Sequence, residues 1–215
     1  MTAQPMFPLQ SALLPGEPLP LRIFEPRYSQ LVRDCLDMTD PAFGVVLITR
    51  GLEVGGGDVR GDVGALARIT EYADHGMGQY QLGTVIGERI RVREWLDDDP
   101  YPRADIEPWP DEPGPPVTHE RIGEIVDAML ALFERIVSAR GARLRPDALA
   151  VAPEVADDPS RHIYALASRV PMGQADRYAV LAAPTLAERV DVLADAIETV
   201  SAMVEFQIAS DDTGE

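Results

Sequence analysis

The chain has 215 residues, of which 46% are hydrophobic, and carries a formal net charge of −17 at pH 7. A chain of this length and apolar content can bury a core, so we predict a globular fold. The sequence contains no apolar run of about 18 residues, which excludes a membrane-spanning helix. Its first residues, MTAQPMFP, lack the charged and apolar regions of a secretory signal, and its single cysteine cannot form an intramolecular disulfide. We therefore expect a cytoplasmic protein.

Lysine is absent from the chain, and all 19 basic residues are arginine. A Walker A loop needs a lysine on the phosphates, and a Ser–Lys peptidase dyad needs an amine that can act as a base. Arginine cannot replace lysine in either role because its guanidinium stays protonated. We therefore predict that the protein has neither ATPase nor Ser–Lys peptidase activity.

Other catalytic and metal-binding patterns are also missing from the sequence. No serine lies in a G-x-S-x-G motif, and the three histidines, His75, His119 and His162, lie on separate segments. No HExxH or CxxC motif occurs. Cys35 falls on the apolar face of a predicted helix, where a buried structural thiol is the usual arrangement. We predict no catalytic residue, no metal site and no cofactor.

The acidic composition also bears on nucleic acid as a partner. The chain has 36 acidic residues against 19 basic ones, whereas phosphate backbones are bound by clustered positive charge. The best basic patch is formed by Arg89, Arg91 and Arg93, which alternate along one face of a predicted strand. Such a row is more typical of a solvated, ion-paired surface, so we do not expect nucleic-acid binding.

The first half of the chain, residues 5–109, is predicted to be rich in strands. Residues 7–28 begin with two short apolar strands around a turn at Pro15 and Gly16, followed by a helix that starts at Pro26. Pro18 and Pro20 cannot donate to a strand ladder, so the second strand should lie at a sheet edge or bulge. Further strands are predicted over residues 43–49, 62–72, 78–86, 88–95 and 103–109. The glycine run at residues 55–57 is predicted to be an inter-strand loop, because a strand rather than a helix follows it. Short strands separated by turns favour a small, partly closed barrel or sandwich.

The second half is predicted to be helical. Residues 111–116, DEPGPP, break both kinds of regular structure and mark a domain boundary, giving domains over residues 1–112 and 117–215. A helix with apolar residues at 3.6-residue spacing is predicted to begin after Thr118 and to end near Gly141. Shorter helices follow around residues 163–170 and 174–183, and Thr185 with Glu188 predicts the capping box of a long last helix.

Residues 7–28, FPLQSALLPGEPLPLRIFEPRY, resemble the start of the N-terminal, substrate-binding domain of Lon proteases. Residues 64–72 (GALARITEY), 79–93 and 165–193 resemble later motifs of that domain, in the same order. The likeness is closest to the free-standing bacterial proteins built from this domain alone. It implies an α+β fold, with an N-terminal PUA-like β pseudo-barrel containing one early helix and a C-terminal helical bundle.

The resemblance further implies a non-enzymatic module that recognises unfolded polypeptide segments or a specific protein partner, without nucleic acid or membrane. Its candidate polypeptide-binding residues match the family's P-L-R-I-F-E-P-R-Y motif and are Arg22, Phe24, Glu25, Arg27 and Tyr28. The same residues have a structural interpretation, in which Ile23 and Phe24 plug the barrel and an arginine pairs with Glu25. Two other functions remain as alternatives: a small-molecule binder or regulator that uses a cleft between the two halves, and, less favoured, a hydrolase.

Overall fold

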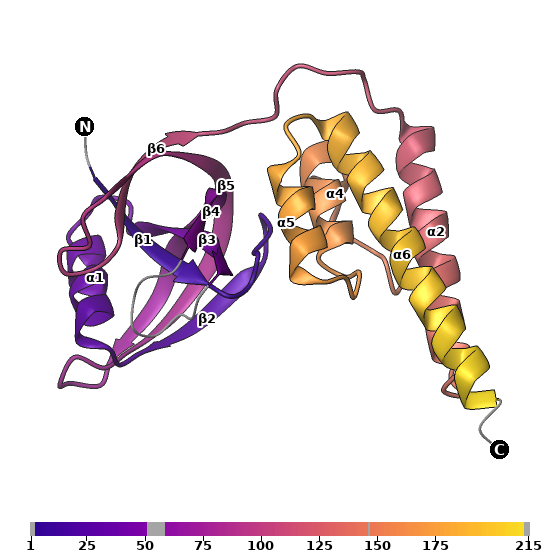
Figure 1. Ribbon diagram of the computed structural model, residues 1–215, viewed down its shortest axis with the longest axis horizontal. Helices are drawn as coiled ribbons and strands as arrows, with labels where there is room; N and C mark the ends of the chain where they lie inside the picture. Colours follow the sequence, from indigo (N-terminus) through magenta and orange to yellow (C-terminus); the bar gives the residue numbers. More distant parts are fainter. Residues whose placement is uncertain (1–2, 51–58, 146, 213–215) are drawn as a thin grey trace. The chain divides into compact units, whose positions relative to one another are not determined.

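The computed structural model describes residues 3–50, 59–145 and 147–212, which divide into two units. The first unit, Met1–Pro110, contains all the described strands and one helix, and the second, Asp111–Glu215, contains the other described helices (Figure 1). The predicted α+β class, with strands first and helices second, is confirmed. The predicted loop at residues 55–57 lies outside the described residues.

The strands of the first unit form a closed ring with one additional strand. In chain order, the elements are β1 (Gln4–Leu9), β2 (Pro18–Ile23), α1 (Pro26–Leu36), β3 (Ala42–Arg50), β4 (Val59–Asp74), β5 (Tyr80–Leu96) and β6 (Arg103–Pro108). The sheet order is β2-β5-β4-β3-β1-β6, and β6 also pairs with β5. Strands β5, β4, β3, β1 and β6 therefore close a barrel, while β2 lies beside the first half of β5. Strand β1 is parallel to β3, and the other pairings are antiparallel.

Strand β5 is continuous where the sequence predicts two strands. Ala65 pairs with Arg89 and Ala67 with Ile86, so two residues of β5, Gly87 and Glu88, lie opposite a single residue of β4. This two-against-one arrangement is a β-bulge, which bends a strand without ending it. The bend lets the first half of β5 pair with β2 and the second half with β6.

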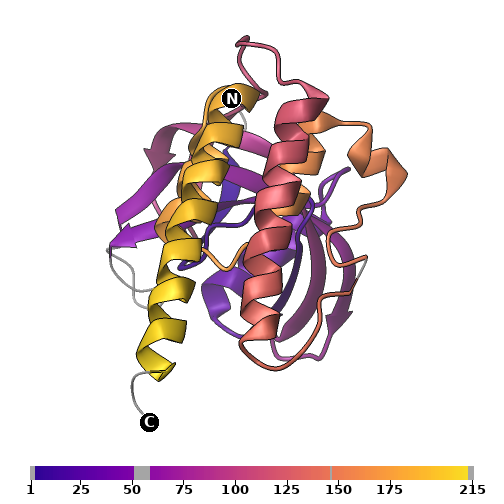
Figure 2. The same cartoon turned by 90° about the vertical axis from the view of Figure 1, so that its right-hand side faces the viewer.

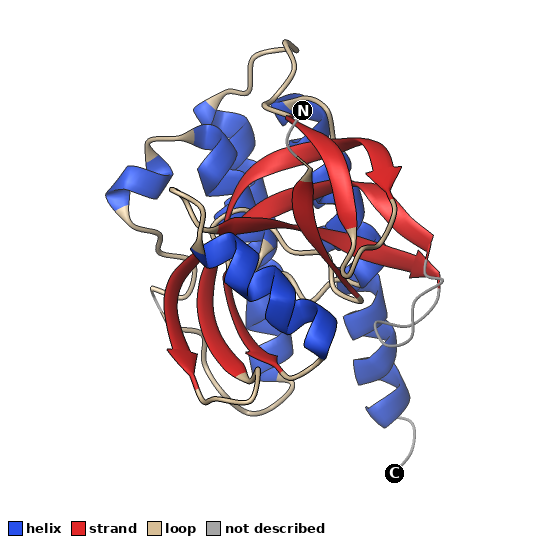
Figure 3. Ribbon diagram, turned by 90° about the vertical axis from the view of Figure 1, so that its left-hand side faces the viewer, coloured by secondary structure: helices blue, strands red, loops and turns tan. Residues whose placement is uncertain are grey.

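Two apolar clusters fill the barrel unit. One joins side chains from around the ring: Met6, Val46, Ile90, Val92 and Ala104. The other lies under α1, where buried helix residues such as Leu31 and Val32 pack with strand residues such as Phe43 and Leu82. Figure 3 shows this helix lying across the strands. The spacing of the apolar residues along α1 thus determines which face of the helix covers the barrel.

Cys35 belongs to the cluster under α1 and is fully buried. Its Sγ lies 3.4 Å from the carbonyl oxygen of Ala42, and burial, reinforced by the charge of Asp34, raises the pKa of the thiol to about 12. Because the thiolate is the reactive form, we expect iodoacetamide to label Cys35 only when the barrel unit opens. Labelling measured by mass spectrometry should accelerate with urea in parallel with unfolding. Rapid labelling of the native protein at pH 8 would contradict this expectation.

The second unit is built around two long helices. Its helices are α2 (His119–Ser138), α3 (Pro153–Ala156), α4 (Pro159–Ala167), α5 (Gln174–Ala182) and α6 (Leu186–Asp212). Helices α2 and α6 lie side by side, and α5 packs against α6 (Figure 2).

The Thr118 hydroxyl accepts a hydrogen bond from the backbone N–H of Arg121 (3.2 Å), as the capping pattern predicts. Gly141, with φ of +65°, follows the end of α2. No described helix has the length and hydropathy needed to cross a membrane.

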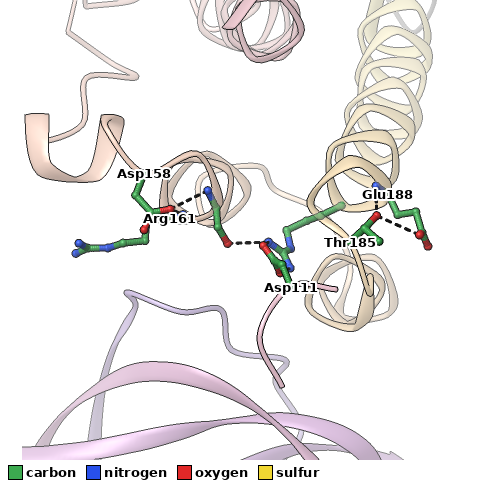
Figure 4. Close-up of polar contacts among 7 residues, drawn as sticks. Asp111, Asp158, Arg161, Thr185 and Glu188 are labelled. Atoms are coloured by element: carbon green, nitrogen blue, oxygen red, sulfur yellow. Dashed lines mark hydrogen bonds and ion pairs between the residues drawn. The ribbon is translucent and has the colours of Figure 1, made fainter. Parts of the chain in front are cut away.

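A buried arginine fastens the first residues of this unit to the helices. The Arg189 guanidinium forms a two-point ion pair with the Asp111 carboxylate, and its Nη1 also donates to the Ser160 hydroxyl (2.9 Å). The guanidinium carbon lies 4.2 Å from the centre of the Tyr164 ring. Figure 4 shows the Asp111 contact near the start of α6, where the Thr185 hydroxyl accepts from the N–H of Glu188 and donates to its carboxylate. The segment from Asp111 is therefore part of the helical unit.

Candidate polypeptide-binding surface

The predicted site residues lie at the junction of β2 and α1. Strand alternation turns Ile23 into the core, so Phe24 points outward and is 72% exposed. The structural interpretation of the motif expected Phe24 to plug the barrel together with Ile23. Phe24 does not, because its side chain is exposed to solvent. Glu25 occupies the N-cap position of α1 with an extended backbone, but its side chain does not cap the helix. Its carboxylate instead accepts a hydrogen bond from Nε of Arg27 (3.1 Å).

The remaining predicted residues divide between the core and the surface. Tyr28 is buried, and its ring centre lies 4.2 Å from that of Phe7. The guanidinium carbon of Arg27 lies 4.5 Å from the Tyr28 ring centre, so this arginine covers the aromatic core. Arg22 is exposed near the end of β2, opposite Gln81. Arg22 and Phe24 are thus the two predicted residues whose side chains are exposed, whereas Glu25 and Arg27 are half-buried.

The turn between β4 and β5 lies next to this junction. The Ser29 hydroxyl, in the first turn of α1, hydrogen-bonds to the carbonyl oxygen of Gly78 in the turn, and Figure 1 shows both segments at the same end of the barrel. Within the turn, the N–H of His75 donates to the Gln79 carbonyl (2.9 Å), and the N–H of Gln79 donates to the Gly76 carbonyl (3.0 Å). The turn is therefore held by hydrogen bonds on both sides.

Met77 is at the tip of this turn and is 95% exposed. Its φ of +53° is in the left-handed region, where residues other than glycine, asparagine and aspartate are uncommon. Glycines flank it on both sides, and these also have positive φ. The fold therefore holds an apolar side chain in solvent through a conformation that has an energetic cost. The sequence predicted only a gap between the strands at residues 62–72 and 78–86 and did not single out Met77, although a methionine between two glycines was an available signal.

Tyr72 adds a third exposed apolar side chain at this end of the sheet. In the ladder of β2, β5 and β4, Ile23 pairs with Tyr80, and Tyr80 pairs with Asp74. Phe24 directly follows Ile23, Met77 lies midway between Asp74 and Tyr80 in the connecting turn, and Tyr72, which is 58% exposed, precedes Asp74 by two residues. We call Phe24, Tyr72 and Met77 the apolar rim. Its members come from three separate segments at this end of the sheet.

The arginine row on β5 has a different character from the apolar rim. The guanidinium carbons of Arg89 and Arg91 lie 4.4 and 3.9 Å from the centre of the Trp109 ring. Nε of Arg93 donates to the Glu107 carboxylate (2.9 Å). Two of these arginines are thus stacked on an aromatic ring and the third is ion-paired. Elsewhere among the described residues, no group of three or more His, Cys, Asp or Glu side chains is arranged to hold a metal ion.

The order of the elements defines the fold class of the protein, which is a two-part α+β domain in which a strand barrel precedes a helical unit. The chain belongs to the family of the ATP-dependent protease La (LON) substrate-binding domain, whose model matches residues 3–199. The resemblance found in the sequence is therefore confirmed over most of the chain.

Solved structures agree with this assignment. The crystal structure of a Lon N-terminal domain protein from Xanthomonas campestris is similar with a TM-score of 0.63 and 26% identity, over 91% of this chain and 98% of that one. The N-terminal domain of Mycobacterium avium complex Lon protease has the same fold, with a TM-score of 0.58 and 15% identity, over 92% of this chain and 98% of that one. A comparison with curated proteins finds no match.

Proposed function

We propose that the protein is a non-catalytic module that binds polypeptide, either unfolded segments or a specific protein partner, through the apolar rim. The observation that carries the proposal is Met77, which a hydrogen-bonded turn holds 95% exposed in a left-handed conformation. The family, named for a substrate-binding domain, supports the same function. We refer to the bound polypeptide as the client.

The chemistry of the rim suits clients of varied sequence. The methionine thioether is flexible and polarizable, and an exposed aromatic ring offers a large apolar contact. Arg22, exposed on the adjacent strand, can donate hydrogen bonds to client carbonyl or carboxylate groups. The net charge of −17 keeps the protein soluble while it holds an apolar segment. Binding of this kind requires no covalent step and no cofactor, and we propose that it occurs in the cytoplasm.

Truncation of the rim should weaken client binding. We expect Phe24→Ala and Met77→Ala each to raise the Kd by about five- to thirtyfold, which corresponds to about 1–2 kcal/mol of lost apolar contact. The measurement is fluorescence anisotropy of a labelled, reduced and carboxymethylated polypeptide, titrated with the protein at physiological salt. Replacement of apolar residues in that polypeptide should weaken binding as well.

The helical unit offers matched controls for both substitutions. Phe206 is 75% exposed and Met203 is 51% exposed, and both lie on α6. Phe206→Ala and Met203→Ala should leave the Kd unchanged if the barrel rim is the binding surface. If the unmodified protein shows no saturable binding up to about 100 μM, which is weaker than about −5.5 kcal/mol, general client recognition is wrong.

A further inference from the structure

Strand β2 has one open edge. Its residues pair with β5 from Pro18 opposite Val85 to Ile23 opposite Tyr80, without a register shift. It is the terminal strand in the sheet order, and among the described residues no strand pairs with its other side. Figure 1 shows β2 along the border of the barrel.

The hydrogen bonds at the start of β2 determine which backbone groups point to the open edge. The N–H of Ile86 donates to the Glu17 carbonyl (2.9 Å), so position 17 turns its carbonyl towards β5. Backbone polar groups alternate in direction along an antiparallel strand. Positions 19, 21 and 23 therefore face β5, and Pro18, Pro20 and Arg22 face the open edge. All three of these residues are exposed.

Two of the three edge residues are prolines, and this makes the edge rich in acceptors. Pro18, Pro20 and Arg22 each present a carbonyl oxygen, but only Arg22 presents an N–H. A second copy of the same edge would place acceptors against acceptors, so pairing between two copies of this chain is disfavoured. An ordinary extended polypeptide has an N–H at almost every residue and complements this row of carbonyls.

We propose that the client adds to the open edge of β2 as an extended strand. Its N–H groups donate to the carbonyls of Pro18, Pro20 and Arg22, and one of its carbonyls accepts from the N–H of Arg22. Because β2 leads directly into Phe24, a client side chain near the end of the added strand reaches the apolar rim. This inference rests on the proposed function and adds the way in which the client backbone is held.

Substitutions that change edge donors test the inference with the same labelled, carboxymethylated polypeptide. Pro20→Val supplies a second N–H to the edge and should lower the Kd by about two- to tenfold, the usual range for one net hydrogen bond. Arg22→Pro removes the single N–H, whereas Arg22→Ala removes the side chain and keeps that N–H. We expect Arg22→Pro to bind about two- to tenfold more weakly than Arg22→Ala.

Proline at position 22 repeats an arrangement that the strand already contains at positions 18 and 20, so the fold should tolerate it. Circular dichroism and size-exclusion chromatography check that each variant is folded and monodisperse. If Pro20→Val matches the unmodified protein and Arg22→Pro matches Arg22→Ala, while Phe24→Ala still weakens binding, the edge inference is overturned and the proposed function stands. If the unmodified protein does not bind the polypeptide at all, general client recognition fails, and the edge inference, which concerns such a client, fails with it.

Discussion

Asp111→Ala is expected to lower the free energy of unfolding of the helical unit by about 3 kcal/mol. The substitution leaves Arg189, whose side chain is 0% exposed, without its carboxylate partner in a buried position. Removal of one member of a buried pair costs about 3–5 kcal/mol. We expect a value at the lower end of this range because the Asp111 side chain is 25% exposed. Urea denaturation followed by circular dichroism at 222 nm measures the change, because most helical residues belong to this unit.

A surface ion pair in the same unit provides the control. Asp191, whose side chain is 67% exposed, pairs with Arg121 at 2.9 Å. Asp191→Ala should cost less than about 1 kcal/mol, as exposed pairs generally do. The double substitution Asp111→Leu with Arg189→Met should recover much of the lost stability, because it removes both charges together. Equal effects of Asp111→Ala and Asp191→Ala would show that burial of Arg189 does not govern the stability of the unit.

Gly64→Ala is expected to destabilise the barrel unit by about 3 kcal/mol or more. A Cβ at position 64 would lie 2.1 Å from the backbone oxygen of Val45 on the paired strand β3. A backbone oxygen within a sheet cannot move aside without breaking the ladder, so the strands themselves must separate. Both tryptophans of the chain, Trp95 and Trp109, lie in this unit, so tryptophan fluorescence during urea denaturation reports its unfolding separately from the helices.

Two other glycines in strands allow the destabilisation expected from Gly64→Ala to be compared. At Gly44 the nearest atoms to an added Cβ belong to the flexible Met6 side chain, at 2.4 Å, so Gly44→Ala should cost less than Gly64→Ala. At Gly83 the nearest atom is 3.5 Å away, an ordinary contact, and Gly83→Ala should be close to neutral. The expected order of destabilisation is therefore position 64, then 44, then 83. A Gly64→Ala variant as stable as Gly83→Ala would contradict the packing argument.

The features that the sequence predicted correctly depend on neighbouring residues. The helix start after Thr118 and the contacts of Thr185 with Glu188 each involve residues three positions apart, and the turn at Gly16 needs the positive φ that glycine allows. The prolines of β2 indicated an edge strand because proline lacks a donor, and β2 is the terminal strand of the sheet. Such local patterns are visible in a single sequence.

The features that the sequence did not reveal depend on distant residues. Arg189 and Asp111 are 78 positions apart, and no local pattern links them. The stacking of Arg89 and Arg91 on Trp109 follows from the pairing of β5 with β6. The sequence predicted separate strands on either side of Gly87, whereas the sheet accommodates this glycine as part of a bulge in one continuous strand. The apolar rim was only partly anticipated, since Phe24 was named as a candidate but Tyr72 on β4 and Met77 in the β4–β5 turn were not.

The pairing of β1 has a consequence for how the barrel forms during protein synthesis. Strand β1 joins β3 on one side and β6 on the other, with Gln4 opposite Ala104, so the first strand of the barrel to be synthesised pairs with the last. Until β6 has emerged, the ring cannot close, and β1 keeps an unpaired edge while the rest of the unit is translated. Contacts between such distant residues slow folding and prolong the exposure of partly formed sheets. The nascent barrel should therefore resist proteolysis only after residue 108 has left the exit tunnel, and not progressively as each strand appears.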